Sequence, residues 1–170
     1  MRGRVGALMT EMAFVLTSVA VLKEGLFPFL IEHWFTDAEM VSAQLERTAI
    51  LAGGVTALLY LGLGSAARHV YSLPYIQSLG VFAAVHAPVL IGRIADGSSF
   101  SILFFLGRTW EGLLGDALGL FRVMEPGDLP HAALLLTLFL YTAGRAIRIQ
   151  DRQGRGEFES HRVRIRSLRS

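Results

Sequence analysis

Long runs of apolar side chains, interrupted by charge at only a few positions, dominate the first 150 residues of the chain. The runs cover residues 5–31, 48–67, 75–95, 99–121 and 129–149. An α-helix rises about 1.5 Å per residue, so about 20 apolar residues match a hydrocarbon core about 30 Å thick. The runs at 48–67, 75–95 and 129–149 have this length and little internal charge, which predicts three membrane-spanning helices.

The first run is longer than one span needs, and it contains three charged residues. A helix over 5–22 would leave Lys23 and Glu24 at a membrane interface, whereas a helix over 12–31 would bury both. Lysine can extend its charged end toward water while its stem covers apolar surface. Glu11 interrupts the apolar run, which is not typical of a cleaved signal peptide. We therefore expect a retained fourth membrane helix.

The run at 99–121 has the pattern of an amphipathic helix. Its polar and small residues recur at spacings of three and four: Arg108, Glu111, Gly112, Gly115, Asp116, Gly119 and Arg122. Its apolar residues fall on the opposite face: Leu106, Trp110, Leu113, Leu114, Ala117, Leu118 and Phe121. Such a helix suits a membrane surface with its apolar face toward the lipid, or a bundle interior with its polar face inward. We predict an interfacial or re-entrant helix over 99–122.

Arginine placement predicts the topology. Eight arginines fall between Arg145 and Arg169, and basic loops favour the cytoplasmic or matrix side of a membrane. With four crossings, Arg2, Arg4 and Arg68 share that side with the C-terminus. The expected architecture is thus an all-α integral membrane protein with four transmembrane helices and one amphipathic helix, and the alternative is five spans. Residues 1–150 would form the membrane domain and residues 151–170 a basic tail.

The composition supports a membrane protein and narrows its chemistry. Hydrophobic residues make up 52% of the chain and charged residues only 18%, against about 25% charged in a typical soluble domain. The chain has no cysteine, which excludes thiol catalysis and disulfides within it. None of the common hydrolase, zinc-protease or nucleotide-binding motifs occurs. The sequence therefore gives no sign of an enzyme.

Charged residues inside apolar segments define one candidate site. Glu11, Glu24, Arg108, Glu111 and Asp116 could line an ion or proton path, because ionisable residues within a membrane are costly and usually functional. The simpler alternative is that the charges of 99–122 face water or lipid headgroups.

His86 lies near the middle of the run at 75–95 and defines a second candidate. A histidine at mid-membrane depth could ligate haem, but the other four histidines do not lie at that depth, so a partner would have to supply the second ligand. The alternative is a hydrogen-bonded histidine inside the bundle.

Two further sets of residues suggest contact surfaces. Close helix packing is expected where small residues recur, at Gly112, Gly115 and Gly119, and also at the glycines of 53–54 and 62–64. Anionic headgroups or a partner protein are expected to contact the arginines of the tail, which are Arg145, Arg148, Arg152, Arg155, Arg162, Arg164, Arg166 and Arg169. Nucleic acid is a less favoured partner, because few aromatic side chains accompany these arginines.

These observations favour a small non-catalytic membrane subunit that packs into a larger inner-membrane assembly or a homo-oligomer. The membrane would be the bacterial cytoplasmic membrane or the mitochondrial inner membrane, with bound lipids and no indicated cofactor. Two alternatives stay open, namely a small transporter or channel that uses the charges of 99–122 and a haem-bearing electron-transfer anchor.

Overall fold

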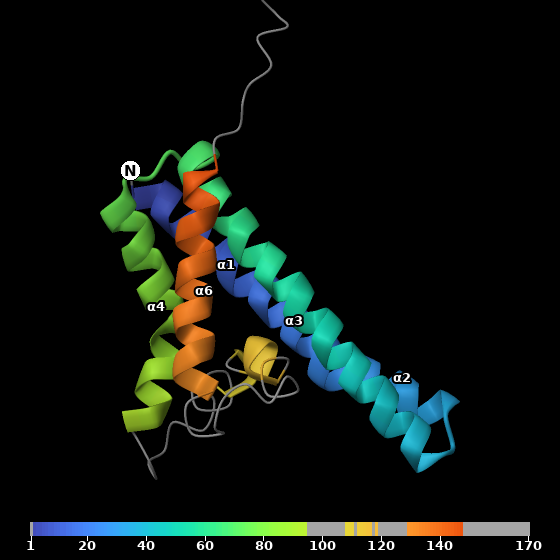
Figure 1. Ribbon diagram of the computed structural model, residues 1–170. Helices are drawn as coiled ribbons and strands as arrows, with labels where there is room; N and C mark the ends of the chain where they lie inside the picture. Colours follow the sequence, from blue (N-terminus) through green and yellow to red (C-terminus); the bar gives the residue numbers. More distant parts are fainter. Residues whose placement is uncertain (1, 95–107, 111, 117, 119–128, 148–170) are drawn as a thin grey trace, which may run out of the picture.

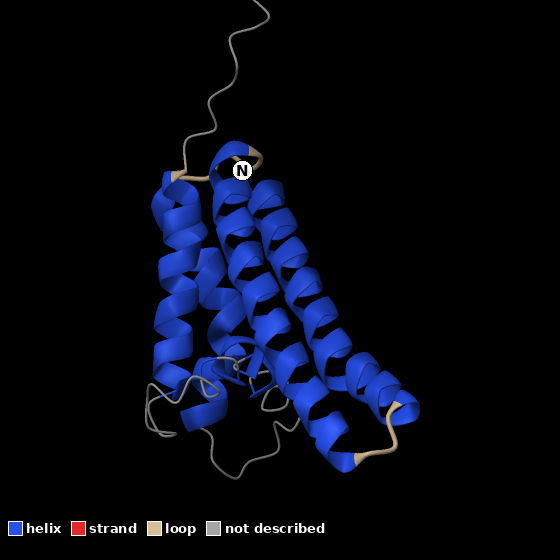
Figure 2. Ribbon diagram, turned by 45° about the vertical axis from the view of Figure 1, so that its right-hand side comes forward, coloured by secondary structure: helices blue, strands red, loops and turns tan. Residues whose placement is uncertain are grey.

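The computed structural model describes residues 2–94, 108–110, 112–116, 118 and 129–147. Within these ranges the chain is helical apart from short connections, and it contains no strand (Figure 2). The predicted all-α class is confirmed. The expected basic tail, residues 151–170, lies outside the described residues, as do Arg148, Glu111 and Gly119, whereas Arg145 is described.

The first apolar run forms one continuous helical stretch rather than stopping at Lys23 and Glu24. Helix α1 (Arg2–Val21) leads into the π-helical turn η1 (Leu22–Leu26) and then into α2 (Phe27–Trp34). The Phe27 backbone N–H donates to the Leu22 carbonyl, which closes the wide turn. Pro28 has no N–H, and its ring would collide with the carbonyl four residues earlier in a regular helix. A wide turn immediately before the proline accommodates this defect without ending the helix.

The remaining helices begin and end close to the predicted runs, with one exception. Helix α4 (Tyr75–Ile94) and helix α6 (Leu129–Ala146) match two of them, but α3 (Ala38–His69) starts ten residues before the predicted run at 48. The Asp37 side chain accepts a hydrogen bond from the Glu39 N–H at 3.1 Å and caps this early start. With 32 residues, α3 is about 48 Å long, against about 30 Å for the 20 residues of α4.

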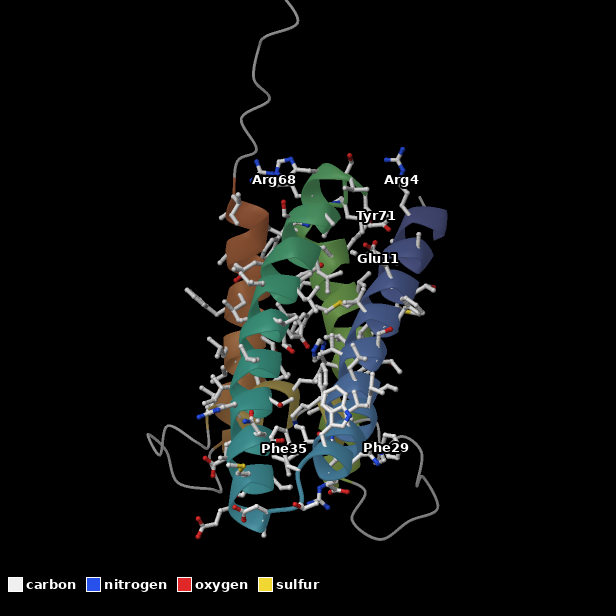
Figure 3. All side chains as sticks on the ribbon, turned by 90° about the vertical axis from the view of Figure 1, so that its right-hand side faces the viewer. Arg4, Glu11, Phe29, Phe35, Arg68 and Tyr71 are labelled. Atoms are coloured by element: carbon white, nitrogen blue, oxygen red, sulfur yellow. The ribbon has the colours of Figure 1, made fainter. Side chains whose placement is uncertain are left out.

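The helices run in two opposite directions (Figure 1). Helices α1 and α4 lead from one end of the bundle to the other, and α3 and α6 return. Arg4, Arg68, Glu11 and Tyr71 therefore lie at one end, whereas Phe29 and Phe35 lie at the other (Figure 3). We call these the basic end, which also holds Arg145, and the aromatic end, which also holds Trp34.

The core forms where helical spacing brings apolar side chains to one face. Leu8, Met12 and Leu16 recur at intervals of four residues on α1 and are fully buried, and Ala20 continues the row. Helix α4 packs against this face of α1 and contributes the buried side chains Val81, Phe82, Val85 and Val89 to the core. Hydropathy alone does not predict which face of α1 or α4 is buried, because both helices also expose large apolar side chains.

Helices α3 and α6 touch through their backbones at two glycines. A Cβ atom on Gly64 would lie 2.0 Å from the Tyr141 carbonyl oxygen, and one on Gly144 would lie 2.0 Å from the Leu61 carbonyl oxygen. No side chain larger than hydrogen fits at either position. Gly54 and Gly62, by contrast, have open space where a Cβ would stand. The expected packing role of the α3 glycines is therefore found at Gly64.

Two of the described helical stretches are long and apolar enough to cross a membrane. They are Gly3–Trp34 and Ala38–His69. Tyr75–Ala87 and Ala132–Ala146 are shorter apolar helices.

Candidate functional site

The polar interior of the bundle centres on His86, which α4 places opposite Tyr60 of α3. His86 is 3% exposed, its Nδ1 lies 2.8 Å from the Phe82 carbonyl oxygen, and its Nε2 lies 2.7 Å from the Tyr60 hydroxyl oxygen. A carbonyl oxygen can only accept, so Nδ1 donates to it. In a neutral ring Nε2 is then the acceptor and the Tyr60 hydroxyl the donor. Both nitrogens of His86 are satisfied.

Aromatic rings enclose this histidine on several sides. The Phe82 ring stacks on the imidazole with 4.1 Å between ring centroids, and the Trp110 ring lies 6.3 Å away. A haem iron would need the Nε2 lone pair that Tyr60 occupies, and the adjoining cavity is only about 10 Å³. These surroundings do not fit a haem ligand; they fit a hydrogen-bonded histidine inside the bundle.

A second polar cluster forms where η1 meets the helical residues of 108–118. Lys23 falls three residues after Ala20 on the buried face of α1 and η1, and it is 7% exposed. Its ammonium group forms an ion pair with Asp116 and donates to the Gly112 carbonyl oxygen at 3.0 Å. Glu24 is a further partner at 2.8 Å. Of the two placements that the sequence left open for Lys23, the structure shows the buried one, with a carboxylate from a distant part of the chain as its partner.

The helical residues of 108–118 have the predicted division into two faces. Trp110, Leu113 and Leu114 are buried, and Arg108 and Asp116 are exposed. The apolar face contacts the bundle core, whereas on the other face Gly112 and Asp116 meet the buried Lys23 ammonium. Trp110 reaches His86, which lies eight residues, or about 12 Å, before the end of α4. The segment is thus inserted between the helices and does not lie flat across their ends.

The basic end holds a third group of polar contacts. Arg68 donates to the Arg145 carbonyl oxygen at 2.9 Å, and Arg145 donates to the Leu73 carbonyl oxygen at 3.0 Å. The Tyr71 hydroxyl donates to the Glu11 carboxyl group, and this hydrogen bond raises the pKa of Tyr71 above its usual value near 10. These contacts tie the connection between α3 and α4 to α1 and α6.

The structure brings together only part of the predicted ion path. Glu24 and Asp116 meet at Lys23, but Glu11 lies 13 residues before Glu24, about 20 Å along the helix. Fully buried Met12 and Leu16 lie between the two carboxyl groups. Arg108 is exposed, and Glu111 lies outside the described residues.

Within the part of the chain that the structure describes, Gly112 and Gly115 make no close helix contact. Gly115 has no atom within 4 Å of where its Cβ would stand, among the residues that the structure describes. A Cβ on Gly112 would only touch Lys23 and Asp116 side-chain atoms at 3.5 Å, an ordinary contact. Among the described residues, close helix contact is found at Gly64 and Gly144 and not at Gly112 or Gly115, where close packing stays a prediction.

Sequence reasoning missed three residues that complete these clusters. Tyr60 pairs with His86, Tyr71 with Glu11, and Lys23 with Asp116. One signal was available, since Lys23 follows Leu8, Met12, Leu16 and Ala20 at helical spacing and so falls on the buried face. The two tyrosines carry no comparable signal, because their partners are 26 and 60 residues away.

None of the protein-family models, curated proteins or solved structures compared with this chain matches it.

Proposed function

We propose that this chain is a small non-catalytic membrane subunit that binds a neighbouring membrane protein, or a second copy of itself, through its aromatic end. In this proposal α1 to α2, α3, α4 and α6 each cross the bilayer once. The segment at 108–118 enters the membrane from the outer side and returns to it. The basic end faces the cytoplasm or matrix.

Exposure of apolar side chains supports the membrane part of the proposal. Only 33% of the most apolar stretch of α3 and 22% of that of Gly3–Trp34 is buried within the chain. Leu51 and Leu58 of α3 are both 69% exposed, and Phe14 of α1 is 71% exposed. The core helix of a soluble protein would bury such side chains, whereas lipid tails solvate them at no cost.

Charge placement supports the orientation. Arg4 and Arg68 lie at the basic end (Figure 3), where Arg68 contacts Arg145. Asp37 lies two residues after Phe35 of the aromatic end, in the acidic connection between α2 and α3. Positively charged connections are retained on the cytoplasmic side during insertion. The N-terminus and the end of α6 would therefore share that side, as four crossings require.

The observation that carries the subunit proposal is the exposure of α2. This apolar helix has no buried residue, and Phe29 and Trp34 are 66% and 71% exposed. Helix α2 contacts η1 and the early part of α3, and Figure 1 shows this pair extending away from α4 and α6. Tryptophan is one of the residues that most often dominate the binding energy of protein interfaces. A neighbouring subunit would cover this extension.

Cysteine crosslinking in native membranes tests the proposal, because the chain has no cysteine of its own. Phe29→Cys and Trp34→Cys should each give one crosslinked species of discrete mass with a short bifunctional reagent. Phe14→Cys is the matched control, because Phe14 is equally exposed but lies in the middle of α1. Crosslinks at neither α2 position, or equal crosslinking at all three, would contradict the proposal.

A transporter is the second candidate, and it is favoured by the ion pair that the buried Lys23 ammonium forms with Asp116. Purified protein in proteoliposomes separates the two functions. A transporter should conduct ions or protons alone, and Asp116→Asn should abolish that flux. A structural subunit should show no flux with either chain.

A further inference from the structure

One buried polar atom beside the His86 cluster has no partner. Trp110 is 8% exposed, and its indole Nε1 is buried without a hydrogen-bond acceptor among the described residues. Leaving a buried N–H donor unpaired costs about 1–3 kcal/mol. Native proteins rarely leave such a group unpaired, and a bound water or ligand is a common partner.

A small cavity adjoins this indole. Its volume is about 10 Å³, and Trp110, Tyr60, His86 and Thr137 contribute to its wall together with apolar side chains such as Val89 and Leu134. A cavity of about 10–15 Å³ on this measure holds one water molecule. The available space thus limits an occupant to a single oxygen-sized group at this point.

The wall also offers the acceptors that such a group needs. The Thr137 hydroxyl donates its proton to the Leu134 carbonyl oxygen at 2.7 Å, so its oxygen lone pairs remain free to accept. Tyr60 donates to His86 at 2.7 Å, which leaves the Tyr60 oxygen free to accept as well. Both nitrogens of His86 are already used. Residues that carry one free donor and two free acceptors therefore line the same cavity.

We propose that this cavity is a binding site for one hydroxyl oxygen, which accepts from the Trp110 indole and donates to the Thr137 oxygen, and, if it belongs to a water, to the Tyr60 oxygen as well. A water has the two protons needed to reach both acceptors, whereas the hydroxyl of an alcohol or lipid can reach only one. A carbonyl oxygen or a halide would satisfy the indole alone. Either source would connect Trp110 of the inserted segment to α6, and a water would also connect it to α3 and, through Tyr60, to His86 of α4.

The indole N–H proton provides a direct reading of this site. Trp34→Phe leaves Trp110 as the only tryptophan, so its ¹⁵N–¹H resonance can be assigned without ambiguity. Thr137→Val should shift that resonance and speed its exchange with solvent, because the bound hydroxyl loses an acceptor. Thr137→Ser retains the hydroxyl and should resemble the parent chain.

Thr142→Val is the matched control, since Thr142 lies on the same helix and donates to the Phe139 carbonyl oxygen at 2.9 Å, but is not in the cavity wall. It should leave the indole resonance unchanged. If Thr137→Val also leaves it unchanged, the proposal is overturned. If Thr137→Val fails to fold, the parent chain decides the question instead. Through-space contact between the indole proton and protons of water or an alcohol supports the proposal, and the absence of such contact overturns it.

Through-space magnetisation transfer to the indole proton distinguishes the two sources of a hydroxyl. Transfer from water alone, unaffected by added hexanol, identifies a bound water. Transfer from alkyl protons of hexanol or detergent, with a saturable shift on titration, identifies an amphiphile. No transfer from either source would overturn the site. None of these outcomes depends on whether α2 binds a partner.

Discussion

The closest approach between helices α3 and α6 gives the most demanding test of the fold. A Cβ on Gly64 would lie 2.0 Å from the Tyr141 carbonyl oxygen and 3.1 Å from the Arg145 backbone nitrogen. Carbon and carbonyl oxygen atoms in contact are about 3.3 Å apart. Gly64→Ala must therefore separate the two backbones by about 1.3 Å at this point, because neither atom belongs to a side chain that could rotate away.

The magnitude follows from two opposing effects. Overpacking a well-packed site costs about 1–3 kcal/mol and occasionally more, and rigid backbone on both sides places this site at the upper end. Alanine is a better helix former than glycine by about 1 kcal/mol, which offsets part of the loss. We expect Gly64→Ala to lower the free energy of unfolding by about 1–3 kcal/mol.

Gly62→Ala is the matched control, because Gly62 is on the same helix and has open space at its Cβ position. It gains helix propensity without a collision and should be neutral or stabilising. Denaturant titration in detergent micelles, followed by tryptophan emission, measures both variants. Equal stability of the two would refute backbone contact between α3 and α6.

The double variant adds a sharper criterion. Gly144→Ala places a Cβ 2.0 Å from the Leu61 carbonyl oxygen at the same helix crossing. Once the helices have moved apart for one alanine, the second costs less. Gly64→Ala with Gly144→Ala should therefore be less destabilising than the sum of the two single variants. Strict additivity would show that the two glycines act at separate places.

Three further predictions concern the polar contacts. Asp116→Asn should destabilise the chain by about 1–2 kcal/mol more than Lys23→Met does. The first variant leaves a buried ammonium group with weaker partners, whereas methionine fills the same space without charge. The reverse order of stability in denaturant titration would contradict the ion pair. Because the pKa of Tyr71 is raised, the stability that its bond to Glu11 contributes is fully present below about pH 10 and lost as the pH rises beyond it; a wild-type minus Tyr71→Phe stability difference that grows with pH would contradict this sign. Asp37→Ala should cost about 1 kcal/mol in the first turn of α3, measured by faster amide hydrogen exchange there, whereas Asp37→Asn should retain the cap.

The inserted position of Trp110 shows where pattern reasoning stops. The spacing of apolar residues correctly separated Trp110, Leu113 and Leu114 from Arg108 and Asp116. It could not say what the apolar face contacts, because lipid tails and a protein core are equally apolar. The contact with His86 joins residues 24 positions apart, and no local pattern records it.

The sequence by itself determined the approximate positions of the apolar helices, since runs of apolar residues act locally, but not the early start of α3 or the continuation of the first helix to Trp34. It also determined that the fold is all-α and that its helices contain few charged residues. Tertiary structure alone decided that Lys23 is buried against Asp116, that Tyr60 satisfies His86, and that Gly64 and Gly144, rather than Gly115, allow close approach. The physical reason is that a helix with apolar side chains on most sides buries a similar apolar surface whichever way it is rotated or shifted along its neighbours. Only steric fit between backbones and the pairing of a few buried polar groups select one arrangement.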